Sequence, residues 1–574
     1  MKTPTTLACM LAAILCAFAF AGRAMTSDLG YQEFELPNGL RFVVVPMNNS
    51  PRVACRIAYN VGSANDKPGK TGMAHFLEHM MFKGTQTIRT SDWAGEEQAL
   101  LKLDQIAAQL ASVNGRIDSA IDADQDPESA DLEKRDELQA EFDAQQKVCD
   151  EFVAGPQFNS YYLDAGATGV NAWTNPDRTV YTANLPANKL ELFFLLEADR
   201  MANSTLRDFY REKQVVLEER RRAEEGAKRR YYEQINALVW EAAPYRNPNL
   251  GWPDDVTSIT RQDMFDYYNE HYVPNNAVVI LAGQVELEDA RELAELYFGE
   301  IERAANPDPI YTVNPPPAVE KTLSAEMDEK PEIRLIYPTV AHHHKHADAL
   351  DVLAWWLDSR SGPLYRDLVV ESQLAVSVSA WHSTMKIGGR FEIVVRPTDI
   401  TRREEISNRI DALLARVFNG EEDAALLDEH INAYAAEWER GLTSTMSTPD
   451  GAATLLANWY FSSGIDALGK RPARVRSLSV KDAIKTAKRY IEQERRVRAF
   501  IIPLQLSVPV DPRLAAEAEL RRQIAEENDP ETKRQLQKML DRLIERREKE
   551  RKDNASSKDA APADQPLQEA GASA

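Results

Sequence analysis

Hydrophobic and polar residues alternate with a period of two between residues 31 and 60, a pattern that predicts β-strands. Two apolar runs flank the turn Pro37-Asn38-Gly39, which is typical of a β-hairpin. Residues 52–60 predict a further strand. A Gly- and Lys-rich loop follows, and then a helix that begins near Thr71. The first part of the chain is therefore expected to place a helix directly after a sheet.

The periodicity changes between residues 96 and 152. Apolar residues there recur at helical spacing on both sides of a polar loop at 122–131. We predict two long antiparallel helices, which form a helical hairpin inserted into the first half of the protein. Two roles fit this hairpin equally well: an insertion that packs on itself, or a device for partner docking or gating.

The remaining elements follow the same reasoning. We expect a strand over 171–183, helices over 190–201 and 208–225, and an apolar strand over 276–283. After a proline-rich stretch the order roughly repeats. The expected elements are strands over 333–337, 375–379 and 390–395, and helices over 347–357 and from residues 402 and 424.

The predicted fold is therefore α+β, with two homologous halves, each an antiparallel-rich sheet covered by helices. The halves span 31–305, which includes the hairpin insertion, and 331–510, and a linker at 306–330 joins them. Residues 511–552 predict a charged helical tail, and residues 553–574 predict a disordered one.

The first 24 residues have the order of a secretory signal peptide. A lysine precedes a 14-residue apolar run, and small residues follow it. We expect cleavage after Ala24, with Ala21 as the second choice, and export to a bacterial periplasm. An uncleaved anchor is the alternative, although the run is short for a membrane span. No later stretch is long and apolar enough to cross a bilayer.

Composition excludes several classes of protein. The chain has 574 residues, of which 43% are hydrophobic, so wholesale disorder is excluded. The formal net charge of −22 argues against a nucleic-acid binder and against docking on anionic lipid. Of four cysteines, Cys55 and Cys149 lie outside the signal segment. One disulfide and two buried thiols remain equally possible for this pair.

The chemistry is concentrated in the run His75-Phe76-Leu77-Glu78-His79. Residues i and i+4 share a helix face, so both imidazoles can reach one metal ion. Glu78 lies beside them, offset from the metal, where it can accept a proton. Glu212 and Glu219 are two helical turns apart and can offer a carboxylate ligand. On this motif alone, a pair of satisfied surface or core histidines is as plausible as a metal site.

Longer segments make the assignment more specific. HFLEHMMFKGT (75–85) resembles the inverted zinc motif of the pitrilysin–insulinase metallopeptidases, the inverzincins, and especially their shorter branch, which includes mitochondrial processing peptidase. The resemblance covers about residues 31–505. The other segments that carry it are LPNGLRFVVVP (36–46), VGSANDKPGKTGMAHFLEHM (61–80), GVNAWTNPDRTVYTANLP (169–186), EKQVVLEERR (212–221) and VLAWWLDSRSGPLYRDL (352–368).

The resemblance implies a zinc endopeptidase that hydrolyses peptides or unfolded polypeptide segments. It implies one Zn²⁺ per chain with three ligands: His75, His79 and Glu219. It further implies that Glu78 is the general base for a zinc-activated water and that Glu212 supports the site. Asn171 and Ala172 fall on the strand that pairs with an extended substrate. The 140 residues between His79 and Glu219 exceed the usual family spacing, and the inserted hairpin accounts for the excess.

One departure from the family concerns the second half. Its members commonly place an Arg and, seven residues later, a Tyr in the facing half, where Val369 and Val376 stand here. Neither valine can donate a hydrogen bond. We therefore expect a homologous partner subunit that lacks the zinc motif and supplies the Arg and Tyr, with a homodimer as the alternative.

Two other functions stay open. One is a catalytically silent structural subunit of the same fold, and the other is a scaffold built on the hairpin and the charged tail. The histidines at 342, 343, 344 and 346 are expected to form a solvated turn rather than a second metal site.

Overall fold

The computed structural model describes residues 29–504, apart from 313, 422 and 423, together with 517, 520, 521, 523, 524 and 531–544. The expected signal segment 1–24 and the tail 553–574 lie outside the described residues. Within the expected charged tail, residues 531–544 are helical. The described residues between 503 and 544, with 326–329, form a unit of their own, and the other described residues form the second.

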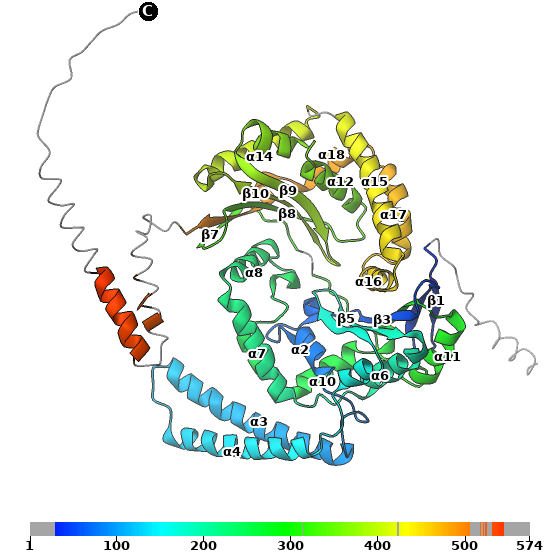
Figure 1. Ribbon diagram of the computed structural model, residues 1–574, viewed down its shortest axis with the longest axis vertical. Coiled ribbons are helices and arrows are strands. Elements are labelled where there is room, and N and C mark those ends of the chain that lie inside the picture. The colour runs from blue at the N-terminus through cyan, green and yellow to red at the C-terminus, as the bar shows by residue number, and fades with distance from the viewer. Residues whose placement is uncertain are drawn as a thin grey trace, which may run out of the picture. The chain divides into compact units, whose positions relative to one another are not determined.

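The first half is built on a six-stranded sheet (Figure 1). Its strand order is β1 (Gln32–Glu35), β2 (Arg41–Pro46), β6 (Ala277–Gly283), β3 (Arg52–Tyr59), β5 (Thr179–Pro186) and β4 (Thr168–Thr174). Only the β2–β6 pair is parallel. The predicted hairpin is confirmed as β1 and β2, and Gly39 in its turn has φ 90°, a conformation that favours glycine.

Helices cover both faces of this sheet. On one face lies the main core, which includes side chains from α2 (Met73–Met80), α5 (Phe158–Asp164), α6 (Leu190–Asn203), α7 (Phe209–Glu225), α10 (Arg261–His271) and α11 (Leu287–Phe298). On the other face, apolar residues of α16 (Pro449–Tyr460) pack against β2, β3 and β6. The helices α8 (Ala227–Val239) and α9 (Pro253–Ser258) follow α7 in the chain.

The prediction of one strand over 171–183 is wrong, because the chain turns back between β4 and β5. Pro176 in this turn has no N–H to donate to a strand ladder. The Asn175 side chain accepts hydrogen bonds from the backbone N–H groups of Asp177 (2.8 Å) and Arg178 (2.9 Å). Such a side-chain turn competes with strand pairing. The result is an antiparallel hairpin with β4 at the sheet edge.

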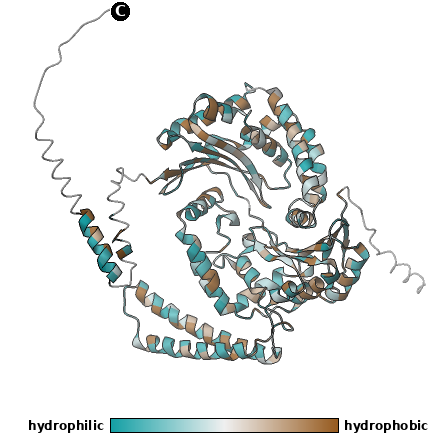
Figure 2. Ribbon diagram, in the orientation of Figure 1, coloured by the Kyte–Doolittle hydropathy of each residue, from teal (hydrophilic) through white to brown (hydrophobic). Residues whose placement is uncertain are grey.

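The inserted helical hairpin is confirmed as α3 (Trp93–Asp122) and α4 (Ser129–Glu151). Its connecting loop is shorter than expected. The two helices share small clusters of apolar side chains, and Figure 2 shows that hydrophilic residues dominate α4. The clusters contain buried Ala99, Leu100, Leu103, Ile106, Val113, Ile117, Leu138 and Cys149. Cys149 and Cys55 are both buried free thiols, so the disulfide alternative is wrong.

The second half is built on a five-stranded sheet of order β7 (Lys321–Met327), β11 (Val497–Pro503), β8 (Glu332–Thr339), β10 (Gly389–Pro397) and β9 (Ala375–Thr384). The β11–β8, β8–β10 and β10–β9 pairs are antiparallel. Its core includes residues from α12 (Ala347–Asp358), α14 (Arg403–Phe418), α15 (Ala424–Met446), α17 (Asp466–Arg476) and α18 (Val480–Tyr490). A short α13 (Pro363–Tyr365) continues into a π-helical turn over Arg366–Glu371.

The two-halved α+β fold is thus confirmed. None of the helices in the described part of the chain could span a membrane.

Candidate metal centre

Helix α2 presents its two sides to different surroundings. Phe76, Leu77 and Met80 are buried in the main core, which leaves His75 and His79 on the opposite side. The N-terminal end of the helix is satisfied by Asp66, whose carboxylate accepts from the backbone N–H of Gly72 (2.8 Å) and of Ala74 (3.0 Å). Burial raises the pKa of Asp66 to about 7. This cap fixes where the motif helix begins.

Helix α7 crosses beside α2 and contributes the third side chain. Phe209 of α7 stacks on Phe76 of α2 at 5.0 Å between ring centroids. Glu219 Oε2 lies 3.7 Å from His75 Nε2 and 3.6 Å from His79 Nε2. Among the described residues, these three are the one group of His, Cys, Asp or Glu that could hold a metal ion, and their ligand atoms all lie within 4.8 Å of one another.

These residues fit a zinc ion. Zinc bonds of about 2.0–2.2 Å in tetrahedral geometry place ligand atoms roughly 3.3 Å apart, close to the separations seen here. Two neutral imidazoles and a carboxylate are a donor set that zinc accepts. Burial, together with the charges of His79 and Arg229, lowers the pKa of His75 to about 3. His75 is therefore neutral at pH 7, as a metal ligand must be.

His75 and His79 differ in their outer contacts. The buried Nδ1 of His75 has no hydrogen-bond partner within the described structure. In contrast, His79 Nδ1 lies 2.9 Å from Glu212 Oε1, and Lys83 Nζ lies 2.5 Å from Glu212 Oε2. Burial lowers the pKa of His79, but the hydrogen bond and charge of Glu212 outweigh it, so the pKa is raised. Burial raises the pKa of Glu212, but the hydrogen bonds from His79 and Lys83 prevail and lower it.

Glu78 lies beside the group without belonging to it. Glu78 is only 8% exposed, and burial raises the pKa of its carboxyl group. Thr174 of β4 donates a 2.5 Å hydrogen bond to Glu78 Oε2, and Thr179 of β5 is 3.2 Å from the Thr174 hydroxyl. The sequence offered no signal for Thr174, because its role depends on the contact between β4 and α2.

The other predicted residues differ in their exposure. Asn171 and Ala172 are on β4, the edge strand that also carries Thr174, with Asn171 exposed and Ala172 buried. In the second half, Val376 of β9 is 68% exposed, whereas Val369 is partly buried against the core.

The expectation of a solvated histidine turn holds for His343, which is exposed. It is wrong for its partly buried neighbours. His342 Nδ1 is hydrogen-bonded to Thr384, and His346 Nδ1 lies 2.8 Å from the Tyr490 hydroxyl. Both side chains are held by second-half elements rather than by solvent alone.

Known proteins and family models that match this chain are described as peptidases or proteases. A family model described as "Insulinase (Peptidase family M16)" matches residues 42–154, and one described as "Peptidase M16 inactive domain" matches residues 258–434. The "Zinc protease PqqE" of Helicobacter pylori is 25% identical over 484 residues, which cover 82% of this chain and 93% of that protein. The "Mitochondrial-processing peptidase subunit beta" of Bos taurus is 26% identical over 269 residues, or 46% of this chain and 41% of that protein.

The fold also matches solved structures. The periplasmic protease PqqL from Escherichia coli superimposes with a TM-score of 0.64 at 16% identity. The match covers 90% of this chain and 51% of the larger protein, so the chain spans about half of PqqL. At this identity the likeness shows the fold alone.

Proposed function

The chain belongs to the insulinase (M16) family of peptidases, and from this we propose that it is a zinc-dependent endopeptidase that hydrolyses peptides or unfolded polypeptide segments. The single observation that carries the proposal is the convergence of two imidazoles and one carboxylate beside a buried glutamate. The ligands in this proposal are His75, His79 and Glu219, which hold one zinc ion per chain.

Each residue has a defined task in the proposed reaction. Zinc, when bound, supplies a Lewis acid that polarises a peptide carbonyl and lowers the pKa of water. Glu78 accepts a proton from the attacking water and returns it to the leaving amine. Thr174 engages one carboxylate oxygen of Glu78, which leaves the other to accept that proton. The outer edge of β4 carries Asn171 and Ala172 and pairs with no other strand in the described structure, so it is suited to pair with an extended substrate.

Two substitutions test this function. Glu78→Gln keeps all three ligands, so zinc should be retained while peptide cleavage falls by at least about 10²–10⁴-fold. His75→Ala should lose both zinc and cleavage. Cleavage of an unstructured peptide at the parent rate by Glu78→Gln would overturn the assigned role of Glu78. Zinc binding without any cleavage by the parent protein, alone or with partners, would instead support the silent-subunit alternative.

A partner subunit completes the proposal. Val369 and Val376 provide no hydrogen-bond donor for the scissile carbonyl. A second homologous chain that lacks the zinc motif would bring the Arg and Tyr, with a homodimer as the alternative. The zinc-loaded chain should be assayed alone and with the candidate homologue. Full activity of the lone chain, unchanged by the homologue, would exclude the heterodimer.

We also propose export to a bacterial periplasm with removal of residues 1–24. The order of charged, apolar and small residues supports this. N-terminal sequencing of the mature protein should begin at residue 25, or at residue 22. A cytoplasmic protein that retains Met1 would refute it.

A further inference from the structure

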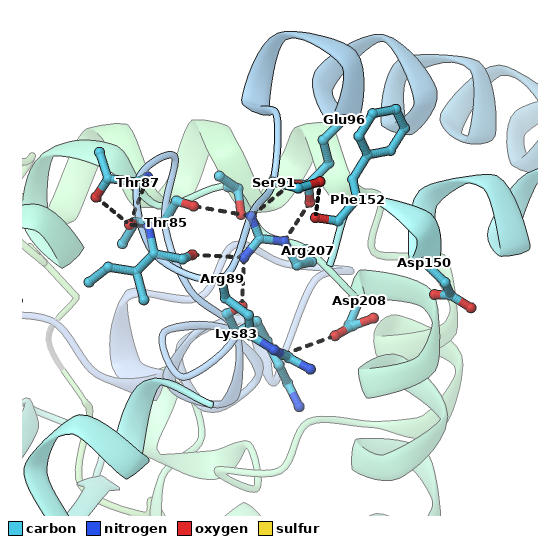
Figure 3. Close-up of polar contacts among 12 residues, drawn as sticks. Lys83, Thr85, Thr87, Arg89, Ser91, Glu96, Asp150, Phe152, Arg207 and Asp208 are labelled. Atoms are coloured by element: carbon cyan, nitrogen blue, oxygen red, sulfur yellow. Dashed lines mark hydrogen bonds and ion pairs between the residues drawn. The ribbon is translucent and has the colours of Figure 1, made fainter. Parts of the chain in front are cut away.

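The root of the inserted hairpin consists of the first turns of α3 and the last turns of α4, and it is hydrogen-bonded to the segment that follows α2. Arg207 is buried, and its guanidinium contacts Glu96 of α3 through Nε (2.5 Å) and Nη2 (2.8 Å), as Figure 3 shows. The same guanidinium donates to the carbonyl oxygens of Lys83, Thr85 and Ile88, each at 3.1 Å. One arginine thus joins the hairpin to the backbone of residues 83–88. The fixed fork of a guanidinium suits such a junction.

Lys83 continues this chain of contacts towards the metal centre. Its carbonyl accepts from Arg207, while its ammonium lies 2.5 Å from Glu212 Oε2. The other oxygen of Glu212 accepts from His79 Nδ1 at 2.9 Å. Both oxygens of this carboxylate are therefore engaged. With Nδ1 protonated, His79 directs its unprotonated Nε2 towards His75 and Glu219.

The hairpin also braces α7, which carries Glu212 and Glu219. The Tyr210 hydroxyl donates to Asp104 of α3 at 2.8 Å, and Arg211 pairs with Asp150 of α4 at 2.5 Å. Tyr210 also packs edge-on against Phe142 at 5.2 Å between centroids. These α7 residues face the hairpin, and a groove of about 660 Å³ lies between the two.

We propose that Lys83 is a positioning residue for His79, acting through Glu212, and that the root of the hairpin holds Lys83 and α7 in the arrangement that binds the metal. The inference rests on the proposed zinc function. It assigns the hairpin a role that neither self-packing nor partner docking describes: the insertion is part of the support of the metal site. Its distal part, about residues 109–137, makes no hydrogen bond or ion pair with α2 or α7 in the described structure and is not part of this support.

The test is a zinc-affinity series on the full-length protein, measured by competition with a chromophoric chelator. Lys83→Met should weaken zinc binding about tenfold, as loss of an outer partner of a metal ligand does. Lys83→Arg keeps the cation and should restore most of the affinity. In a Glu212→Ala background, Lys83→Met should have no further effect, because Lys83 acts through Glu212. The visible absorption spectrum of the Co²⁺-loaded protein should change in Lys83→Met, which a purely structural role would not cause.

Two root variants and one distal control test the hairpin. Glu96→Gln and Tyr210→Phe should each weaken zinc binding severalfold, whereas Arg116→Ala, which breaks the distal Arg116–Asp131 pair, should leave it unchanged. If Glu96→Gln fails to fold, Tyr210→Phe decides, since it keeps the ring and loses one hydrogen bond. Parent affinity in Lys83→Met, or equal affinities in Tyr210→Phe and Arg116→Ala, would overturn the inference while the parent still binds zinc. Absence of zinc binding by the parent would instead overturn the proposed function itself.

Discussion

Helices α2 and α12 each follow a strand in their own half, but their polar side chains are satisfied in different ways. Asp348 and Asp351 of α12 are both paired with Arg471 of α17, so this cluster contains its own cation. Among the described residues, the ion-pair contacts of Glu219 at the α2 site are the two imidazoles. His75 Nδ1 is buried there without a partner.

The difference shows that the same strand-to-helix arrangement can hold an ion-paired cluster in one half and a group of metal-binding side chains in the other. In the second half, a guanidinium completes the charge balance and locks α12 to α17. In the first half, Glu219 makes no ion pair with a lysine or arginine in the part of the chain that the structure describes, and a metal ion would complete the set. The second half should therefore depend on its ion pairs for stability, and the first half should depend on its metal.

The largest expected effect is on zinc binding. His75→Ala should weaken it by more than the roughly 10–100-fold that an outer-shell loss costs, because a direct ligand is removed. Asp348→Asn, in the corresponding helix of the second half, should leave zinc content unchanged. Metal analysis after dialysis measures both. Equal zinc loss in the two variants would break the comparison.

The next effect is on stability. Arg471→Met removes the buried cation that Asp348 and Asp351 share. Asp351 keeps its contact with His382 at 2.7 Å, so the free energy of unfolding should fall by about 3 kcal/mol. Arg474→Ala is the matched control. Arg474 also contacts Asp348, at 3.0 Å, but its side chain is 48% exposed, so the loss should be below about 1 kcal/mol. Urea denaturation measures both, and similar losses would contradict the assigned role of Arg471.

Metal removal should act on one half only. If zinc is present at about 100 times its Kd, a chelator should cost about 2.7 kcal/mol of stability. Hydrogen exchange should then speed up in α2 and α7 but not in α12 and α17. Faster exchange across both halves would mean that the metal supports the whole fold rather than one site.

The smallest effect depends on pH. Burial and the charges of Arg178 and Arg471 lower the pKa of His342 to about 4, against the opposing charges of Asp351 and Asp177. The unfolded chain binds this proton near pH 6.5, so stability is lost as pH falls from about 6.5 to 4. Allowing for solvent screening, His342 should contribute about 1–2 kcal/mol of this loss. Urea curves at pH 4.5 and 7 should show a smaller difference for His342→Asn; an unchanged difference would rule out His342 as its source.

The sequence predicted most elements because their periodicity is local. Helix α7 and the hairpin helices lie close to their expected bounds. The β4–β5 turn differs from the single strand predicted because strand-like residues continue on both sides of Asn175-Pro176, where the chain reverses.

The residues of the candidate site also divide into those that a local sequence pattern indicates and those that it does not. His75, Glu78 and His79 could be placed from helical spacing, and the resemblance supplied Glu219. The roles of Thr174 and Lys83 could not be predicted from the sequence. Thr174 contacts Glu78, which is 96 residues away in sequence, and Lys83 contacts Glu212, which is 129 residues away. Contacts of that range follow from the packing of the sheet and helices, which no local pattern encodes.

The central claim is that one zinc ion is held by His75, His79 and Glu219 in the first half. Anomalous diffraction from crystals of the mature protein, recorded on both sides of the zinc absorption edge, tests it directly. We expect a single peak within about 2.0–2.2 Å of the two Nε2 atoms and a Glu219 oxygen. A zinc peak at the second-half histidines, or none beside α2 in zinc-loaded crystals, would contradict it.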